Sequence, residues 1–166
     1  EPALLSDDDR HLLATLDATR AAVTAHLEAF RFQDAARALY DFVWSGFCDW
    51  SLEVAKTDLY AEDAARRDHV FALLTHTLSC ALRLLHPFMP FLTEELWHQM
   101  GYGTAEESIM TAPWPEPFTP EQAAAWGLCE ETTAFVEAKH ALVTAGRALR
   151  ADYNIPPAKT VAFILQ

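Results

Sequence analysis

Apolar residues recur at helical spacing through most of the chain. They predict helices over residues 7–29, 32–56 and 61–86, a short helix through Glu94 to Met100, and a last long helix that ends near Tyr153. Short connections between the first three helices favour an antiparallel arrangement. The pattern predicts an all-α fold, an antiparallel helical bundle of about five helices.

The second predicted helix has the widest apolar stripe. Tyr40, Trp44 and Cys48 extend the stripe beyond half of the helix surface, which predicts a central position in the bundle. The residues at helical spacing in this stripe are Phe32, Ala36, Leu39, Val43, Phe47, Trp50 and Val54.

Polar and proline residues mark where these helices begin and end. Ser6 before three aspartates is a typical N-cap, and Pro87 disfavours helical geometry at His86, where the third helix should end. Residues 101–118 contain two Gly, one Ser and three Pro and predict one long crossover loop, after which Thr119 caps the last helix. The expected inner stripe of that helix is Leu128, Phe135, Leu142, Leu149 and Tyr153.

The chain end predicts a short extended tail. Pro156 and Pro157 stop the last helix, and Val161–Leu165 has the composition of one strand with no partner strand in the sequence. We therefore divide the chain into a helical bundle over residues 1–158 and the truncated start of a following strand over 159–166.

Composition narrows the class of protein. The 166 residues suit a single core, and no apolar run approaches the ~20 residues that span a bilayer. Cys48, Cys80 and Cys129 lie within helical patterns, so we expect buried free thiols in a reducing compartment.

The formal net charge of −12 repels nucleic acid, so RNA binding would require the 12 Lys and Arg to cluster. The acidic charge also favours an alternative function, a helical protein–protein interaction module.

Motifs for catalysis are sparse. The sequence has no Gly-rich phosphate loop, no Gly-x-Ser-x-Gly and no Cys-x-x-Cys. Two Glu-x-x-His pairs are the pattern that carboxylate-bridged di-iron bundles use together with two further glutamates. Here the candidate ligands are Glu95, His98, Glu137, His140, Glu28 and Glu53. The first pair is on a short helix between prolines and the second on a solvated face, so we expect no metal site and keep a di-iron oxidase as the less favoured alternative.

Two groups of residues have the chemistry that RNA requires. Arg31 and Phe32 stand at a junction between two helices, where a cation and an exposed ring suit phosphate and unstacked bases. Phe32 turned inward as a hydrophobic staple fits the sequence equally well. Lys139, Arg147 and Arg150 fall near one face of the last helix, as a small basic strip or as ordinary charges near a helix C-terminus.

Several long segments resemble one known family. Residues 30–44, Phe47-Cys48-Asp49-Trp50 and residues 84–97 are similar to the anticodon-binding helical-bundle domain of valyl-tRNA synthetases, which are class Ia aminoacyl-tRNA synthetases. So are Ser108-Ile109-Met110, Trp114-Pro115 and the stretch from Arg147 through Asn154-Ile155-Pro156-Pro157. The Phe-Cys-Asp-Trp stretch separates the chain from isoleucyl and leucyl relatives. Ser51 departs from the family pattern, which usually has Tyr there.

The resemblance implies a part of a larger enzyme. Such a protein biosynthesis enzyme, a valine–tRNA ligase, activates valine with ATP and esterifies it to tRNA in a nucleotide-binding domain with HIGH and KMSKS motifs. Neither motif occurs here, so we expect no catalytic residue and no cofactor in this fragment, with ATP bound only by the parent enzyme. The implied partners are the anticodon arm of tRNA(Val) and the catalytic domain of the same chain, in the cytoplasm, with neither membrane nor DNA.

Topology suggests where RNA would bind. The first helix leads away from the domain entrance over about 35 Å at 1.5 Å per residue, and the third helix leads away again to His86. Arg31 and Phe32 should then lie beside the turn after His86, at the far end of the bundle. We predict Arg31 and Phe32 as the main RNA-binding residues, and Thr93 and Leu96 as weaker neighbours.

Overall fold

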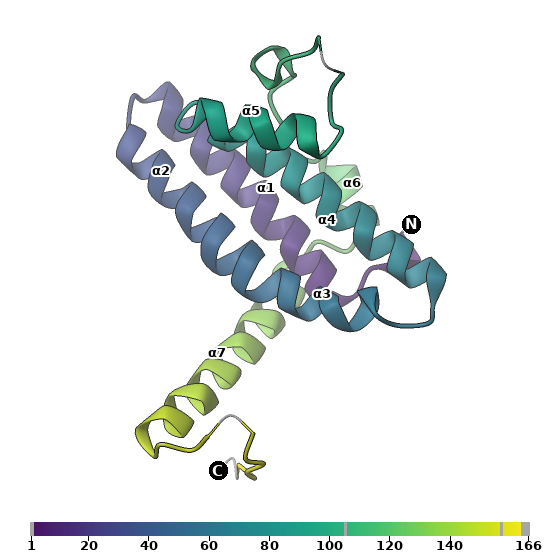
Figure 1. The fold of residues 1–166 in the computed structure, drawn as a ribbon, viewed down its shortest axis with the longest axis vertical. Helices are drawn as coiled ribbons and strands as arrows, with labels where there is room; N and C mark the ends of the chain where they lie inside the picture. Colours follow the sequence, from purple (N-terminus) through teal and green to yellow (C-terminus); the bar gives the residue numbers. More distant parts are fainter. Residues whose placement is uncertain (1, 105, 157, 164–166) are drawn as a thin grey trace.

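The computed structural model describes residues 2–104, 106–156 and 158–163, and no strand occurs in these ranges. η1 and η3 are single 3₁₀ turns and η2 is π-helical. The elements in chain order are η1 (Pro2–Leu4), α1 (Asp7–Glu28), α2 (Phe32–Tyr40), η2 (Asp41–Ser51), α3 (Leu52–Leu59), α4 (Ala64–Leu85), α5 (Pro90–Gln99), η3 (Ile109–Thr111), α6 (Pro120–Ala125) and α7 (Glu130–Asp152) (Figure 1). The prediction of an all-α helical bundle is confirmed.

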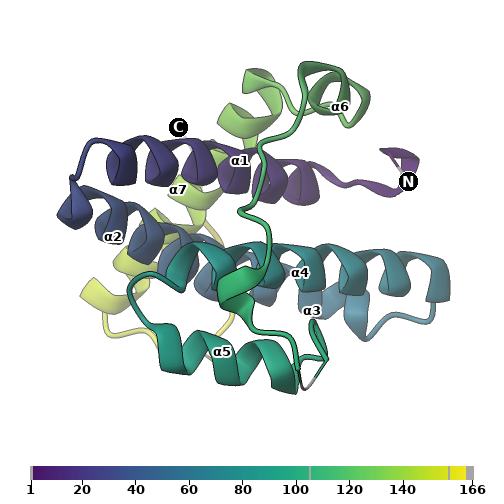
Figure 2. The ribbon, with the colours of Figure 1, turned by 90° about the horizontal axis from the view of Figure 1, so that it is seen from above.

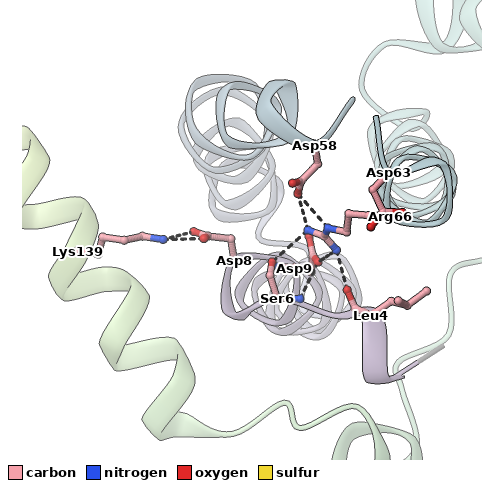
Figure 3. Close-up of polar contacts among 8 residues, drawn as sticks. All are labelled: Leu4, Ser6, Asp8, Asp9, Asp58, Asp63, Arg66 and Lys139. Atoms are coloured by element: carbon pink, nitrogen blue, oxygen red, sulfur yellow. Dashed lines mark hydrogen bonds and ion pairs between the residues drawn. The ribbon is translucent and has the colours of Figure 1, made fainter. Parts of the chain in front are cut away.

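A polar network joins the starts of α1 and α4 to the end of α3. Ser6 caps α1, because its hydroxyl accepts from the Asp9 amide while the Asp9 carboxylate accepts from the Ser6 amide. Arg66 of α4 donates to Asp9, to Asp58 at 2.7 Å and to the Leu4 carbonyl at 2.7 Å (Figure 3). Burial alone would lower the pKa of Arg66, but its bonds and charge pairing with Asp9 and Asp58 raise it. The guanidinium is therefore a permanent charge that holds three elements together.

The second helical segment is continuous but not uniform, which corrects the prediction of one regular α-helix over residues 32–56. In η2 the Leu52 amide bonds to the Phe47 carbonyl five residues back, as in a π-helix. The wider turn moves the buried side from Leu39 to Phe42 and Phe47, while Ala36 stays exposed. Tyr40, Trp44 and Cys48, which the apolar pattern places in the buried stripe, are exposed as well.

The core forms between α1, α4 and the second segment. One cluster lies towards the chain start and includes Leu5, Leu12, Leu13, Leu16, Phe42, Phe47, Leu73, Cys80 and Ala81. A second cluster lies towards the α1–α2 turn and includes Val23, Ala35, Leu39 and Leu84. α1, α4 and the second segment each contribute residues to both clusters, so all three take part in the core.

The predicted crossover loop is present between α5 and α6. Figure 2 shows it passing across α4 to α1. The Trp114 indole donates to the Thr24 hydroxyl at 2.9 Å, and the Phe118 amide donates to the Asp17 carboxylate at 2.9 Å. These bonds anchor a chain segment of little regular structure to the side of α1.

The last helix is interrupted, which corrects the prediction of one helix from Thr119 to Tyr153. Gly127 has φ +67°, and the amides of Gly127 and Leu128 bond back to carbonyls of α6, so α6 ends there. α7 starts anew at Glu130 and projects from the bundle (Figure 1). Its expected inner stripe is largely exposed, at Phe135, Leu142, Leu149 and Tyr153, and the buried residue of α7 is Val136.

The tail shows no strand pairing in the part that the structure describes. Residues 158–159 form a turn and bend, and residues 160–163 have no regular structure. The remainder of the predicted strand, 164–166, lies outside the described residues.

Candidate nucleic-acid interface

The α1–α2 turn presents two phenylalanines to solvent. Phe30 has φ +56°, a left-handed conformation that is costly for a side chain with a Cβ, and the Arg31 amide closes the turn on the His26 carbonyl at 2.8 Å. Phe32, the first residue of α2, is 55% exposed and meets the Phe30 ring edge-on at 6.2 Å. The turn thus displays an aromatic pair instead of burying Phe32 as a staple.

Arg31 stands between Phe30 and Phe32 in the sequence and is the N-cap residue of α2. Its guanidinium is 3.9 Å from the Asp34 carboxylate, and both side chains are more than half exposed. Such a surface pair contributes ~0–1 kcal/mol, so little free energy opposes turning Arg31 towards a phosphate.

Thr93, in the first turn of α5, is buried and bonds to residues of the α4–α5 turn. The Thr93 side chain is 1% exposed, its hydroxyl lies 2.8 Å from His86 Nδ1, and it donates to the Met89 carbonyl at 2.9 Å. Leu96 is half-buried against the cluster formed by Leu82, Trp97 and Ile109. Both predicted neighbours therefore support the turn from inside.

The exposed part of this turn consists of residues that the sequence analysis missed. Phe91 is almost fully exposed, and Met89 and Leu92 are exposed beside it. The sequence contains a signal for this exposure. Pro90 is the first residue of α5, so Phe91 and Leu92 lie in the first turn of the helix, before its buried side begins.

The two turns lie at the same end of the bundle, as topology predicted (Figure 2). Ala35 and Leu39 of α2 share a core cluster with Leu84 of α4, and Phe88 from the α4–α5 turn packs against it. We call the exposed side chains of the two turns the far-end surface; they are Phe30, Arg31, Phe32, Met89, Phe91 and Leu92.

Lys139, Arg147 and Arg150 of α7, considered above as a basic strip or as ordinary surface charges, make contacts within the chain. Lys139 bonds to the Asp8 carboxylate at 2.6 Å (Figure 3). Arg147 lies over the Trp50 ring, 5.3 Å from its centroid. Arg150 donates to the Pro156 carbonyl at 2.6 Å. These cations hold α7 and the tail in place, which makes Arg31 the better candidate for phosphate contact.

The Glu-x-x-His pairs do not converge on one site. His98 bonds to Glu94 at 3.1 Å on α5, whereas His140 on α7 stacks on Trp50 with ring centroids 3.9 Å apart. α5 and α7 occupy opposite ends of the molecule (Figure 1). The carboxylates proposed as ligands have exposed side chains, at Glu95, Glu137, Glu28 and Glu53. Among the described residues no group of three metal-ligating side chains occurs, so the di-iron alternative loses its basis.

Two of the three cysteines differ from expectation. Cys80 is buried, but Cys48 and Cys129 are exposed free thiols. Cys48 lies on the outer side of η2 and Cys129 stands at the N-cap of α7, positions created by the π-helical turn and by the helix break.

Within the described residues, no helix is long and apolar enough to cross a membrane.

Comparison with known proteins supports the family resemblance seen in the sequence. A family model described as the anticodon-binding domain of tRNA ligase matches residues 9–165. The chain therefore belongs to the family of anticodon-binding domains of tRNA ligases.

Several relatives of the chain are valine–tRNA ligases. The chain is 40% identical to valine–tRNA ligase of Geobacter sulfurreducens over 97% of its own length, and covers 18% of that protein. It is 38% identical to the valine–tRNA ligases of Geobacillus kaustophilus and Stenotrophomonas maltophilia over 95% and 99% of its length, and covers 17% of each. The chain thus spans less than a fifth of the length of these relatives.

Proposed function

We propose that this domain binds the anticodon arm of tRNA(Val) as part of a cytoplasmic valine–tRNA ligase. Another part of that polypeptide would activate valine with ATP and transfer it to the tRNA. The observation that carries the proposal is the far-end surface, where Phe32 is 55% exposed beside Arg31 in a chain 40% identical to a valine–tRNA ligase.

The chemistry of this surface suits a single-stranded loop. Valine codons begin with GU, so valine anticodons end in A and C, and a domain that recognises them needs flat surfaces for splayed bases. The exposed rings of Phe30, Phe32 and Phe91 offer such surfaces, and Arg31 supplies a cation. The net charge of −12 makes non-specific attraction weak, so affinity has to come from these local contacts and from the rest of the enzyme.

The proposal is tested by Phe32→Ala in the full-length enzyme. Loss of one stacked base costs ~1–3 kcal/mol, roughly a 5- to 150-fold loss in affinity for tRNA. We expect kcat/KM for tRNA charging to fall within this range, while valine-dependent ATP–pyrophosphate exchange stays unchanged. Phe71→Ala is a matched control, because Phe71 is similarly exposed but lies on α4.

Arg31→Ala tests the cation separately. We expect weaker tRNA binding with a shallower dependence on salt, since one phosphate contact is lost. If the Phe32 and Arg31 variants both charge limiting tRNA normally, the anticodon site lies elsewhere on this domain.

A further inference from the structure

A groove of about 310 Å³ lies between the second helical segment and the α4–α5 turn. Pockets that bind small ligands have volumes of ~300–1,000 Å³, so this groove has room for one small planar group. The residues that line it include Ala36, Tyr40 and Trp44 on one side and Leu85, Phe88 and Met89 on the other.

Tyr40 and Trp44 form an exposed aromatic pair in this groove. Their rings are parallel within 8°, with centroids 6.2 Å apart, and the two residues are 61% and 58% exposed. Offset stacking of this kind is favourable, so each ring holds the other in a fixed orientation. Large rings gain free energy by leaving water, and two that stay exposed side by side are typical of a contact surface.

A cation stands beside the aromatic pair. Arg37 precedes Tyr40 by three residues and Trp44 by seven, so all three lie along one side of the helical segment. The Arg37 side chain is exposed, and within the described residues no carboxylate pairs with it.

The carboxylates near Arg37 on the same segment have other surroundings. Asp34 lies 3.9 Å from Arg31, and Asp41 lines a different pocket, beside α1. None of the described residues that line the groove is charged, although the chain has a net charge of −12. The groove and its edge are therefore less repulsive to a phosphate than most of this acidic surface.

The groove adjoins the far-end surface. Met89 belongs to both, and Phe32, Ala36 and Tyr40 follow at intervals of four, on successive turns of α2. Ala36 is exposed and small, so no bulky side chain separates Phe32 from Tyr40 along this line. The helix rises about 12 Å from Phe32 to Tyr40 at 1.5 Å per residue. That rise corresponds to roughly three or four stacked nucleotides at 3.4 Å each.

We propose that the groove is a second base-binding position, where an unpaired RNA base stacks on the Tyr40–Trp44 pair and Arg37 contacts the adjoining phosphate. This inference rests on the proposed binding of tRNA by the domain, and it adds a nucleotide other than the one at Phe32. Every base has a flat face, so stacking at this position does not depend on which base is present. The groove therefore contributes affinity, while discrimination between bases depends on contacts elsewhere.

The combination of rings and cation favours a nucleotide over an apolar peptide as the occupant. A nucleotide has a flat base and a phosphate, and the segment offers a flat aromatic surface with Arg37 one turn away. An apolar peptide would use the rings but has no phosphate for Arg37 to neutralise. The family of anticodon-binding domains, to which the chain belongs, agrees with RNA as the partner.

The occupant is identified by photo-crosslinking in the full-length protein with a tRNA(Val) transcript. One variant carries p-benzoylphenylalanine in place of Trp44, a second carries it in place of Phe32, and the control carries it in place of Phe71, which is exposed on α4. We expect the probe at 44 to capture a loop nucleotide different from the one captured at 32. Its yield should exceed that of the control by about fivefold or more, the lower end of the effect of one stacked base.

The three probes separate the two proposals. Capture of tRNA at 32 without capture at 44 would overturn the second base-binding position and leave the proposed function standing. Failure to capture tRNA at both 32 and 44 would overturn the proposed function as well. Capture of a second copy or of another part of the enzyme at 44, in place of tRNA, would also overturn this inference.

Substitutions at Trp44 separate stacking from apolar contact. In the full-length enzyme, Trp44→Phe keeps a flat ring, whereas Trp44→Leu keeps an apolar side chain without one. We expect the Phe variant to bind tRNA(Val) within about twofold of the parent enzyme and the Leu variant to bind it roughly 5- to 150-fold more weakly, at equal Tm. Equal affinities of the Phe and Leu variants would refute stacking at this position.

Arg37→Gln tests the phosphate contact at the same position. We expect its tRNA binding to show a shallower dependence on salt, by about one phosphate contact, than that of the parent enzyme. An unchanged salt dependence would refute the role of Arg37.

Discussion

Removing the Arg66 guanidinium should destabilise the chain more than any other single charge deletion near the start of the bundle. Arg66→Met keeps the aliphatic stem of the side chain but removes its bonds to Asp9, Asp58 and the Leu4 carbonyl (Figure 3). The side chains of Arg66 and Asp9 are only 17% and 10% exposed, so the variant leaves a largely buried carboxylate without its partner.

The expected loss follows from the burial of this pair. Breaking a fully buried ion pair costs ~3–5 kcal/mol, whereas an exposed pair is worth ~0–1 kcal/mol. The Asp58 side chain is 31% exposed, so its share is nearer the lower value. We expect a loss of about 3 kcal/mol in the free energy of unfolding, or a fall of about 6–12 °C in Tm for a domain of this size.

Urea and thermal unfolding of the 166-residue chain measure this loss. Arg67→Met is the matched control, because Arg67 is the neighbouring residue and its ion pair to Asp68 is long, at 3.9 Å, and exposed. The control should change stability by no more than about 0.5 kcal/mol. A loss below about 1 kcal/mol in Arg66→Met, the range of an exposed pair, would refute the view that this network joins three elements.

Two further predictions concern the helix break and the side of α7 that binds the bundle. Gly127→Ala should lower the free energy of unfolding more than Gly101→Ala. Both glycines have positive φ, but only at position 127 would an added Cβ meet another side chain, that of Arg10, at 3.1 Å. Equal losses in chemical denaturation would contradict this. Burial lowers the pKa values of His11 and His140 below 6.5. The folded chain therefore binds protons at these residues less readily than the unfolded chain does. The free energy of unfolding should fall as pH drops from about 6.5 through the folded pKa values. His11→Gln with His140→Phe should reduce the decrease in Tm between pH 7 and pH 5, and an unchanged decrease would show that these histidines do not couple folding to pH.

The sequence predicts the parts of the fold that local chemistry determines. The bounds of α1 and α4 follow from their caps and from the proline after His86, and the paired turns at the far end follow from helix lengths alone. The exposed position of Arg31 also follows from its place at a helix junction.

The sequence does not reveal geometry that depends on longer-range packing. The π-helical turn over Asp41–Ser51 changes which side of the segment is buried, and the period of the apolar residues does not show this change in advance. Thr93 looks like a polar surface residue until its hydroxyl is seen to hold His86 and Met89 together.

The exposed apolar residues of α7, Phe135, Leu142 and Leu149, show a second limit of sequence patterns. Their spacing indicates a contact surface but not the contact partner, so the pattern alone places them in the core of this bundle. A periodic apolar pattern indicates that one side of a helix is buried. It does not show whether this bundle or another part of a longer protein buries that side.

The central claim, that the far-end surface binds anticodon bases, is tested most directly by a double-mutant cycle between protein and RNA. Charging is measured for the full-length enzyme with Phe32 intact and for its Phe32→Ala variant, each on tRNA(Val) transcripts with the native anticodon or with its A or C replaced. If Phe32 stacks on one of these bases, the two losses in kcat/KM will not add, because each change removes the same contact. Additive losses at both bases, with Phe32→Ala equally harmful on every transcript, would contradict the account.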